Sequence, residues 1–235
     1  MKIEQVVGEF YRLDLGMVNA YLIDEQELTL IDTGTPGKAD LILEGIAELG
    51  RKPEELRHIL VTHLHVDHTG SLAELKRRTG ATVHMHPVTA EKVAKGVGSR
   101  EMNRAPTFLS LLATTVLRGL MPSGMEGCEA DELLKDRELL TFAGGAEVVH
   151  LPGHAAGQIG VLTPRHGGVL IVADAATNMG GRLSYPIVVE NLAVTEDTLR
   201  RIGALRFEAA LFGHGKPILS GAAEAFRRRW PSNQE

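Results

Sequence analysis

The chain has 235 residues and a formal net charge of −5, and 43% of its residues are hydrophobic, which is enough to bury a core without cross-links. This hydrophobic content argues against a disordered chain, and the acidic balance argues against a nucleic-acid partner. The single cysteine, Cys128, excludes an internal disulfide bond. No secretory signal pattern opens the chain, and its longest apolar stretch, residues 108–117, is too short to span a membrane. We therefore expect a cytoplasmic protein without a membrane partner.

In the first third of the chain, short strand patterns alternate with helical patterns. The strand patterns are β-branched or aliphatic runs that end at turn residues, and they cover residues 6–13, 17–23, 27–31, 58–62 and 81–85. One helix is predicted between Pro36 and Gly50, where apolar residues recur every three or four positions. A second helix is predicted at about 69–78. This alternation is typical of an α/β fold.

The middle of the chain, about residues 91–138, follows a different pattern. Leu109, Leu112, Val116 and Leu120 recur at helical spacing, and a turn-rich stretch follows them. We interpret this segment as a helical insertion on the surface of a single domain that covers residues 1–235. Its apolar face suits either a lid over a substrate or a surface for a homodimer.

The last hundred residues return to the pattern of the beginning. Strands are predicted at 146–151, 159–163, 168–173 and 208–212, and helices at about 195–202 and 221–229. Strand-rich layers covered by helices are therefore expected in this half as well.

Four potential metal ligands lie within six residues directly after the predicted strand at 58–62. They are His63, His65, Asp67 and His68, which stand in the sequence Thr-His-Leu-His-Val-Asp-His. The carboxyl end of a strand is where sites on sheets usually lie, and alternation along an extended chain lets His63 and His65 point the same way. Imidazole and carboxylate ligands without thiolates suit Zn, Fe or Mn better than a structural cysteine-zinc site.

Three further ligand-capable residues follow apolar runs in the second half of the chain. These residues are His154, Asp174 and His214. Each stands where a loop leaves a strand, which is a common place for functional side chains. Seven candidate ligands exceed the needs of one tetrahedral ion, so the sequence predicts two divalent metal ions, most simply Zn²⁺. The other five of the ten histidines have no place in this pattern and are interpreted as structural or solvated.

These motifs, in this order and spacing, resemble the metallo-β-lactamase-fold superfamily. The resemblance rests on Leu-Ile-Asp-Thr-Gly at 30–34, the histidine motif at 62–68, Pro-Gly-His at 152–154, Asp174, and Gly-His-Gly at 213–215. It implies a four-layer αβ/βα sandwich of two mixed sheets with helices outside. It also implies that His63, His65 and His154 hold one ion, that Asp67, His68 and His214 hold the other, and that Asp174 bridges them. Asp32 would be a structural residue near the site.

The expected chemistry is the hydrolysis of a small carboxyl ester, thioester or lactone. Two ions roughly 3.5–4 Å apart can share a hydroxide that attacks a carbonyl carbon, while one ion stabilises the developing oxyanion. Asp67 is the candidate catalytic residue, because a carboxylate at the edge of the metal centre can carry a proton to the leaving group. A small-molecule substrate is the expected partner.

Departures from individual families keep the substrate open. Many class B β-lactamases have cysteine where this chain has Asp174. Glyoxalase II resembles the metal motifs but has a helical domain after the last histidine, and because 21 residues follow His214 here, its glutathione-binding residues cannot be carried over. Lactonases often have a tyrosine shortly after the bridging aspartate, whereas the first tyrosine here is Tyr185. One alternative is an oxidoreductase like the persulfide dioxygenases, with a single iron on His63, His154 and Asp174. Another is a non-catalytic member of the fold.

Overall fold

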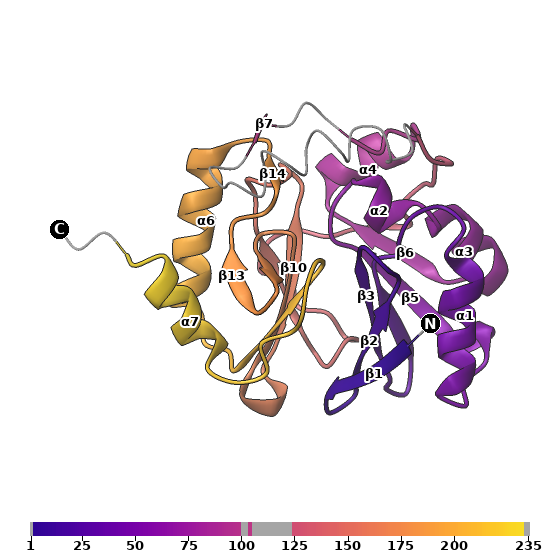
Figure 1. Cartoon of the computed structure of the whole chain (residues 1–235). Helices are drawn as coiled ribbons and strands as arrows, with labels where there is room; N and C mark the ends of the chain where they lie inside the picture. Colours follow the sequence, from indigo (N-terminus) through magenta and orange to yellow (C-terminus); the bar gives the residue numbers. More distant parts are fainter. Residues whose placement is uncertain (1, 100–102, 105–123, 233–235) are drawn as a thin grey trace.

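The computed structural model describes residues 2–99, 103–104 and 124–232, and it arranges them around two β-sheets that pack face to face (Figure 1). The larger sheet has seven strands in the order β1-β2-β3-β4-β5-β6-β8. Their bounds are β1 Lys2–Val7, β2 Phe10–Asp14, β3 Asn19–Ile23, β4 Leu28–Ile31, β5 Leu56–Val61, β6 Thr82–Met85 and β8 Glu132–Leu133. The pairs β1–β2, β2–β3 and β3–β4 are antiparallel, and the pairs β4–β5, β5–β6 and β6–β8 are parallel, so this sheet is mixed.

The smaller of the two packed sheets has four strands in the order β15-β11-β10-β9. Their bounds are β9 Glu147–His150, β10 Ile159–Thr163, β11 Val169–Ala173 and β15 Ala209–Phe212. Strands β11 and β15 are parallel, and the other two pairs are antiparallel. Two small ribbons are formed by β12 Thr177–Met179 with β13 Arg182–Ser184, and by β7 Asn103–Arg104 with β14 Val188–Val189.

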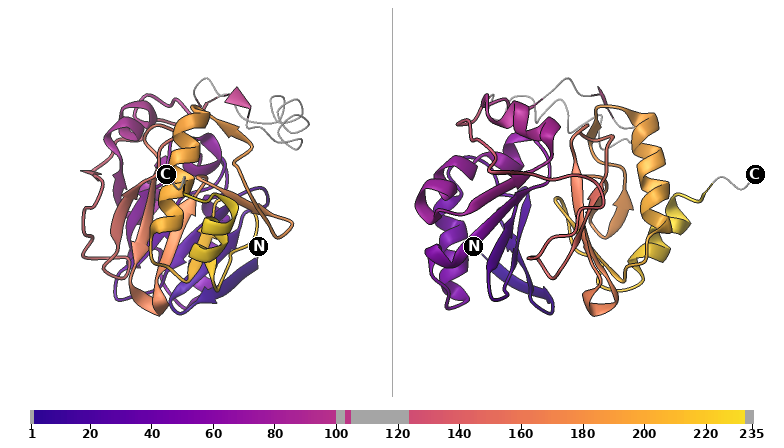
Figure 2. Two further views of the ribbon diagram at one scale, coloured as in Figure 1. Left: turned by 90° about the vertical axis from the view of Figure 1, so that its left-hand side faces the viewer. Right: turned by 180° about the vertical axis from the view of Figure 1, so that it is seen from behind.

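Helices cover the outer faces of both sheets, as the rear view in the right-hand panel of Figure 2 shows. Helices α1 Ala39–Glu48 and α3 Leu72–Thr79 pack on the larger sheet, and α6 Leu192–Ala204 and α7 Ala222–Arg229 pack on the smaller one. Two shorter helices, α2 Val66–Thr69 and α4 Pro87–Val93, follow β5 and β6. Short 3₁₀ turns lie at Pro53–Glu55 and Arg165–Gly167. The expected sandwich of two mixed sheets between outer helices is confirmed.

Neighbouring residues of one strand enter different layers of the core, which explains why the strand sequences are apolar on both faces. In β4, Leu30 packs toward the helices, while Ile31 packs between the sheets. In β11, Leu170 packs under α6 and α7, while Ile171 packs between the sheets. Because side chains alternate along a strand, a strand that is covered on both faces must be apolar at successive positions.

Two parts of the first half differ from the sequence-based expectation. The single strand expected at 6–13 is a hairpin of β1 and β2, which turns at Gly8 with a φ of +50°. The helical insertion expected at about 91–138 lies partly outside the described residues, because its predicted apolar helix falls within 105–123. Residues 124–138 contain no helix, and part of their backbone pairs with β6 instead: β8 adds to the sheet edge, and Leu134 donates to the Met85 carbonyl. In the described ranges, no helix has the length and apolar character needed to cross a bilayer.

Candidate metal centre

All seven candidate ligands lie at one edge of the sandwich, on the segments that follow four strands. The loop after β5 carries His63 and His65, and α2, which comes next, carries Asp67 and His68. From the smaller sheet, His154 follows β9, Asp174 follows β11 directly, and His214 follows β15. The two sheets thus contribute four and three candidate ligands to the same place. The structure brings together every residue that the sequence nominated, while their role as metal ligands remains a prediction.

His63, His65 and His154 form the first cluster, in which three nitrogens face one point. The Nε2 of His63 lies 3.0 Å from the Nδ1 of His65, and the Nε2 of His154 lies 3.2 Å and 2.9 Å from these two atoms. Three nitrogens bound tetrahedrally to one Zn²⁺ at 2.0–2.1 Å would lie roughly 3.3 Å apart. The cluster therefore has nearly the size that one ion requires.

Asp67, His68 and His214 form the second cluster, and Asp174 lies between the two clusters. The Nε2 of His214 lies 3.4 Å from Asp67 Oδ2 and 3.1 Å from Asp174 Oδ2. The Nε2 of His68 lies 3.8 Å from Asp67 Oδ2 and 3.6 Å from Asp174 Oδ1. Asp174 Oδ2 is also 3.7 Å from the Nε2 of His154 in the first cluster. One carboxylate therefore faces imidazoles of both clusters.

Hydrogen bonds outside the clusters fix which nitrogen of three imidazoles faces inward. His68 donates from Nδ1 to Asp32 Oδ2 at 2.7 Å, His154 donates to the Val188 carbonyl, and His214 donates to the Met17 carbonyl. A histidine ligand is commonly held in this way, with its other nitrogen bound to a carboxylate or a carbonyl. In the neutral form of each imidazole, the lone pair is then on the Nε2 that faces the centre.

Asp32 supports both clusters at once. Its Oδ2 also accepts from the Thr62 hydroxyl at 2.8 Å, and its Oδ1 accepts from the Thr62 backbone N–H. Because the Thr62 hydroxyl donates to Asp32, its oxygen can accept from the Nδ1–H of His63, which lies 3.0 Å away. Asp32 is 3% exposed and adopts a φ of +62°, a strained conformation of the kind found where function requires it.

Burial and neighbouring charge keep the imidazoles of the first cluster neutral. Burial lowers the pKa of His65 to about 3, with a contribution from His154. Burial also lowers the pKa of His63 well below its ordinary value and lowers the pKa of His154. A neutral imidazole is the form that binds a metal ion, so this cluster is ready to bind a cation without losing a proton.

The second cluster is electrostatically different, because it contains carboxylates. Burial raises the pKa of Asp174, but the facing His214 and His68 outweigh it and lower this pKa well below its ordinary value. Burial lowers the pKa of His214, but Asp174 and Asp67 outweigh it and raise this pKa to about 10. Ionised carboxylates beside imidazoles form a donor set for a divalent cation.

Two buried atoms inside the centre have no hydrogen-bond partner, which fits a cation between them. These atoms are the Nε2 of His68 and the Oδ1 of Asp174. A buried polar atom without a partner is costly, so atoms of this kind in a polar cluster usually serve a ligand. The nitrogen and oxygen donors fit divalent Zn, Fe or Mn.

Several residues that hold the centre together were not predicted from the sequence. Thr62 belongs to the recognised motif but had no assigned role, and Asn19 and Tyr21 of β3 were seen only as part of a strand. The available signal was Asn19 itself, because an asparagine within a wholly buried strand must have hydrogen-bond partners. The remaining histidines make other contacts: His58 bonds His84 at 3.0 Å, His86 stacks on His150, and His166 pairs with Glu9.

Comparison with known proteins agrees with the fold. The model of the metallo-β-lactamase superfamily matches residues 13–214. The chain belongs to this superfamily. An uncharacterised Bacillus subtilis protein, YobT, is 32% identical over 165 residues, which is 70% of this chain and 64% of that protein. The hydroxyacylglutathione hydrolase GloC of Haemophilus influenzae is 31% identical over 146 residues, covering 59% of this chain and 57% of that protein. The chain therefore spans less than two thirds of the length of these two relatives.

Solved structures of the superfamily share the fold at low sequence identity. BJP-1, a subclass B3 metallo-β-lactamase of Bradyrhizobium japonicum, superimposes with a TM-score of 0.73 at 20% identity and covers 98% of this chain and 90% of its own. A β-lactamase from Chitinophaga pinensis gives a TM-score of 0.70 at 22% identity, with 98% and 91% of the two chains covered. At this identity, the likeness shows a common fold and leaves the substrate open.

Proposed function

We propose that this superfamily member is a dinuclear metal-dependent hydrolase that cleaves a small carboxyl ester, thioester or lactone. The observation that carries the proposal is the position of Asp174, whose two oxygens face His68 on one side and His154 and His214 on the other. A carboxylate that lies between two ligand sets is suited to bridge two ions. Two complete sets of candidate ligands favour this function over a single-iron oxidoreductase, which needs ligands for one ion only.

The proposed division of ligands follows the two clusters. His63, His65 and His154 would hold one ion, Asp67, His68 and His214 the other, and Asp174 both. Divalent ions held there, for which Zn²⁺ is our expectation, would lower the pKa of a water molecule and polarise the substrate carbonyl. The Nδ1 hydrogen bonds described above orient the rings of His63, His68, His154 and His214, so that each Nε2 faces the place of an ion.

Asp67 is proposed to move the proton. Its carboxylate is 8% exposed, and it faces His214 and His68. Burial raises the pKa of Asp67, but the charges of His68 and His214 outweigh it and hold the pKa below its ordinary value, so the group is ionised at neutral pH. It can then accept a proton from the attacking water and deliver it to the departing oxygen or sulfur. The products are a carboxylic acid and an alcohol or thiol, or the ring-opened hydroxy acid of a lactone.

The most exposed ligand indicates where a substrate enters. The His214 side chain is 16% exposed, more than those of Asp67, His68 or Asp174. Exposed apolar residues adjoin this opening: Met17 supplies the carbonyl that His214 bonds, and Met179 follows Asn178, whose N–H bonds the His214 carbonyl. An apolar rim around a polar centre suits a substrate with an apolar acyl group. The apolar segment within 105–123 lies outside the described residues, so its role as a lid or a dimer surface remains a prediction.

A substrate screen on protein of measured metal content tests this proposal. The panel would contain short aryl esters, acyl thioesters including a glutathione thioester, and acyl-lactones of increasing chain length. We expect metal-dependent turnover of at least one of these classes by protein that contains two ions per chain. One iron per chain together with oxygen uptake on a persulfide would instead support the oxidoreductase. Two bound ions without hydrolysis of any class would contradict the proposed reaction.

A further inference from the structure

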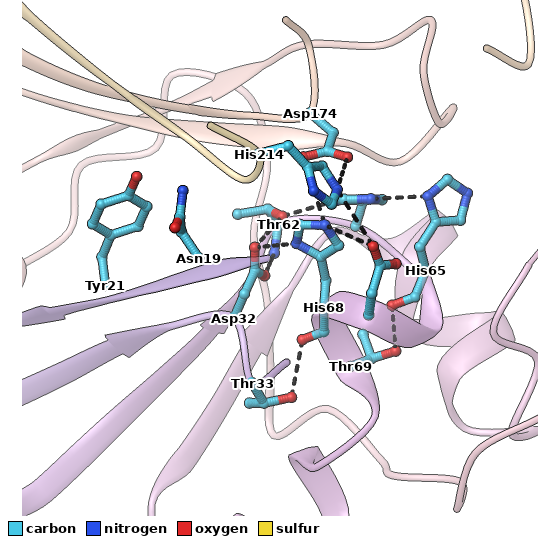
Figure 3. A network of polar contacts seen from close by, with 12 residues as sticks. Asn19, Tyr21, Asp32, Thr33, Thr62, His65, His68, Thr69, Asp174 and His214 are labelled. Carbon is cyan, nitrogen blue, oxygen red and sulfur yellow. Dashed lines mark hydrogen bonds and ion pairs between the residues drawn. The ribbon is translucent and has the colours of Figure 1, made fainter. Parts of the chain in front are cut away.

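The turn that carries His214 is held by residues of the β2–β3 hairpin, far away in the sequence. The side-chain amide of Asn19 donates two hydrogen bonds through Nδ2, one to the Phe212 carbonyl at 2.9 Å and one to the Gly215 carbonyl at 2.8 Å. These carbonyls lie on either side of His214. Tyr21 donates a third bond, from its hydroxyl to the Phe212 carbonyl at 2.7 Å. Figure 3 shows Asn19 and Tyr21 beside the segment that leads to His214.

The same hairpin also contacts the backbone before His214 and the His214 ring. The Asn19 N–H donates to the Gly213 carbonyl at 2.8 Å, and the Met17 carbonyl accepts from His214 Nδ1 at 2.6 Å. Asn19 and Tyr21 are two positions apart on β3, so their side chains lie on one face of the strand, and both are buried. One hairpin of the larger sheet thus sets the place of a ligand that the smaller sheet carries.

The turn depends on this support because of its own sequence. Gly213 tolerates no side chain, since a Cβ there would lie 2.1 Å from Asp174 Oδ1 and 2.7 Å from His68 Cε1. Gly215 adopts a φ of +92°, and a Cβ there would lie 2.3 Å from the Asn178 carbonyl oxygen. Glycines on both sides of His214 give the chain more conformational freedom than other residues would. Contacts from outside the turn must therefore restrict it.

We propose that Asn19 is a positioning residue for the second metal ion, and that Tyr21 assists it. The inference rests on the proposed dinuclear function. By joining the carbonyls on either side of His214, the Asn19 amide places the His214 Nε2 against Asp67 and Asp174. The first cluster contains neither His214 nor a residue that bonds Asn19 or Tyr21, so it does not depend on these contacts. Loss of the Asn19 amide therefore lowers the affinity for the second ion and leaves the affinity for the first ion unchanged.

Zinc titration of chelator-treated protein by calorimetry tests the inference without any substrate. In Asn19→Ala, we expect the first equivalent of Zn²⁺ to bind as in the wild type and the second to bind about 10–100-fold more weakly, the usual cost of losing support behind a ligand. In Tyr21→Phe, the Phe212 carbonyl keeps its bond from Asn19, so a smaller loss in the second affinity is expected. This variant retains the aromatic ring in the core and serves as the second test if Asn19→Ala folds poorly.

Thr163→Val is the matched control. The Thr163 hydroxyl is buried and donates to the Gly144 carbonyl at 3.1 Å, at the other end of β10 from the centre. This variant should lower the melting temperature and leave both zinc affinities unchanged. A second affinity in Asn19→Ala within threefold of the wild type, or an equal weakening of both equivalents, would overturn the inference. If the wild type binds only one equivalent of Zn²⁺, the proposed dinuclear function fails. If the wild type binds two equivalents and Asn19→Ala binds both as tightly, only the positioning role of Asn19 fails.

Discussion

The cluster of His63, His65 and His154 consists of imidazoles alone, whereas the cluster of Asp67, His68 and His214 contains a carboxylate and lies closer to Asp174. Burial keeps the first set neutral, as the lowered pKa of His65 shows. In the second set, ionised carboxylates face imidazoles whose pKa they raise. The first cluster therefore offers three neutral donors at a spacing close to that around one zinc ion, and the second offers charge at longer distances.

The two clusters also differ in how the chain supports them. His63 and His65 are two residues apart on one loop, and Thr62 beside them links His63 to Asp32. His214 comes from the other sheet, and its turn is held by Asn19 and Tyr21, 191–196 residues away along the chain. Each cluster takes one ligand from the smaller sheet, but the His154 ring is held by the Val188 carbonyl of the same half of the chain, whereas the His214 turn is held by β3 of the larger sheet. We therefore expect the second ion to depend more than the first on contacts between the two sheets.

Removal of the shared carboxylate should have the largest effect. Asp174→Ala takes away the group that faces both clusters and leaves His68 and His214 without their closest acceptor in the centre. We expect loss of the second ion or of both, and a fall in kcat/KM of at least about a hundredfold, the range seen when a group that stabilises developing charge is lost. Metal analysis and steady-state kinetics measure both effects. Two retained ions with full turnover would refute the bridging role.

Single-ligand variants should separate the two clusters. His65→Ala removes one of the three donors of the first cluster, so the first ion should be lost and turnover with it. His214→Ala removes a donor that belongs only to the second cluster. The first ion should therefore remain bound with nearly the affinity that it has in the wild type. Metal analysis after dialysis distinguishes these variants. The scheme is wrong if both lose the same ions to the same extent.

Gly213→Ala tests the close packing behind the second cluster. The added methyl group would lie within 2.1 Å of Asp174 Oδ1, so either the turn or the carboxylate must move. We expect the affinity for the second ion to fall by as much as about a hundredfold, while the first ion is retained. Gly145→Ala is a suitable comparison, because a Cβ there meets no atom within 4 Å, although its φ of +67° also strains the alanine. Equal zinc affinities in these two variants would contradict the role of the close contact.

Asp32→Asn should have a smaller effect, but on both clusters. The asparagine amide would direct a donor toward groups that already donate, namely the His68 Nδ1–H and the Thr62 hydroxyl. We expect the affinity for each ion to fall about tenfold. Asp32 supports His63 of the first cluster through Thr62 and contacts His68 of the second cluster directly. Calorimetric titration measures the two constants. An effect on the second ion alone would show that Asp32 does not support the first cluster.

The layered fold could be predicted from the sequence because strands covered on both faces are apolar at successive positions, as Leu30 and Ile31 show. The grouping of the seven candidate ligands at one edge could be predicted because these residues follow such strands and match a known order of motifs. The turn at Gly8 was missed, because Gly8 and Glu9 are the only turn-forming interruption between two short runs of strand-forming residues. The roles of Asn19 and Tyr21 could not be predicted, because their partners are backbone carbonyls nearly two hundred residues away.

The central claim is that seven side chains hold two ions and that both are needed for hydrolysis. Its most direct test is to add Zn²⁺ stepwise to chelator-treated wild-type protein and to measure calorimetric binding and hydrolysis of the best substrate on the same samples. We predict two binding steps and a hydrolysis rate that rises with the second equivalent until it is filled. A single binding step, or a full hydrolysis rate after the first equivalent, would contradict the account.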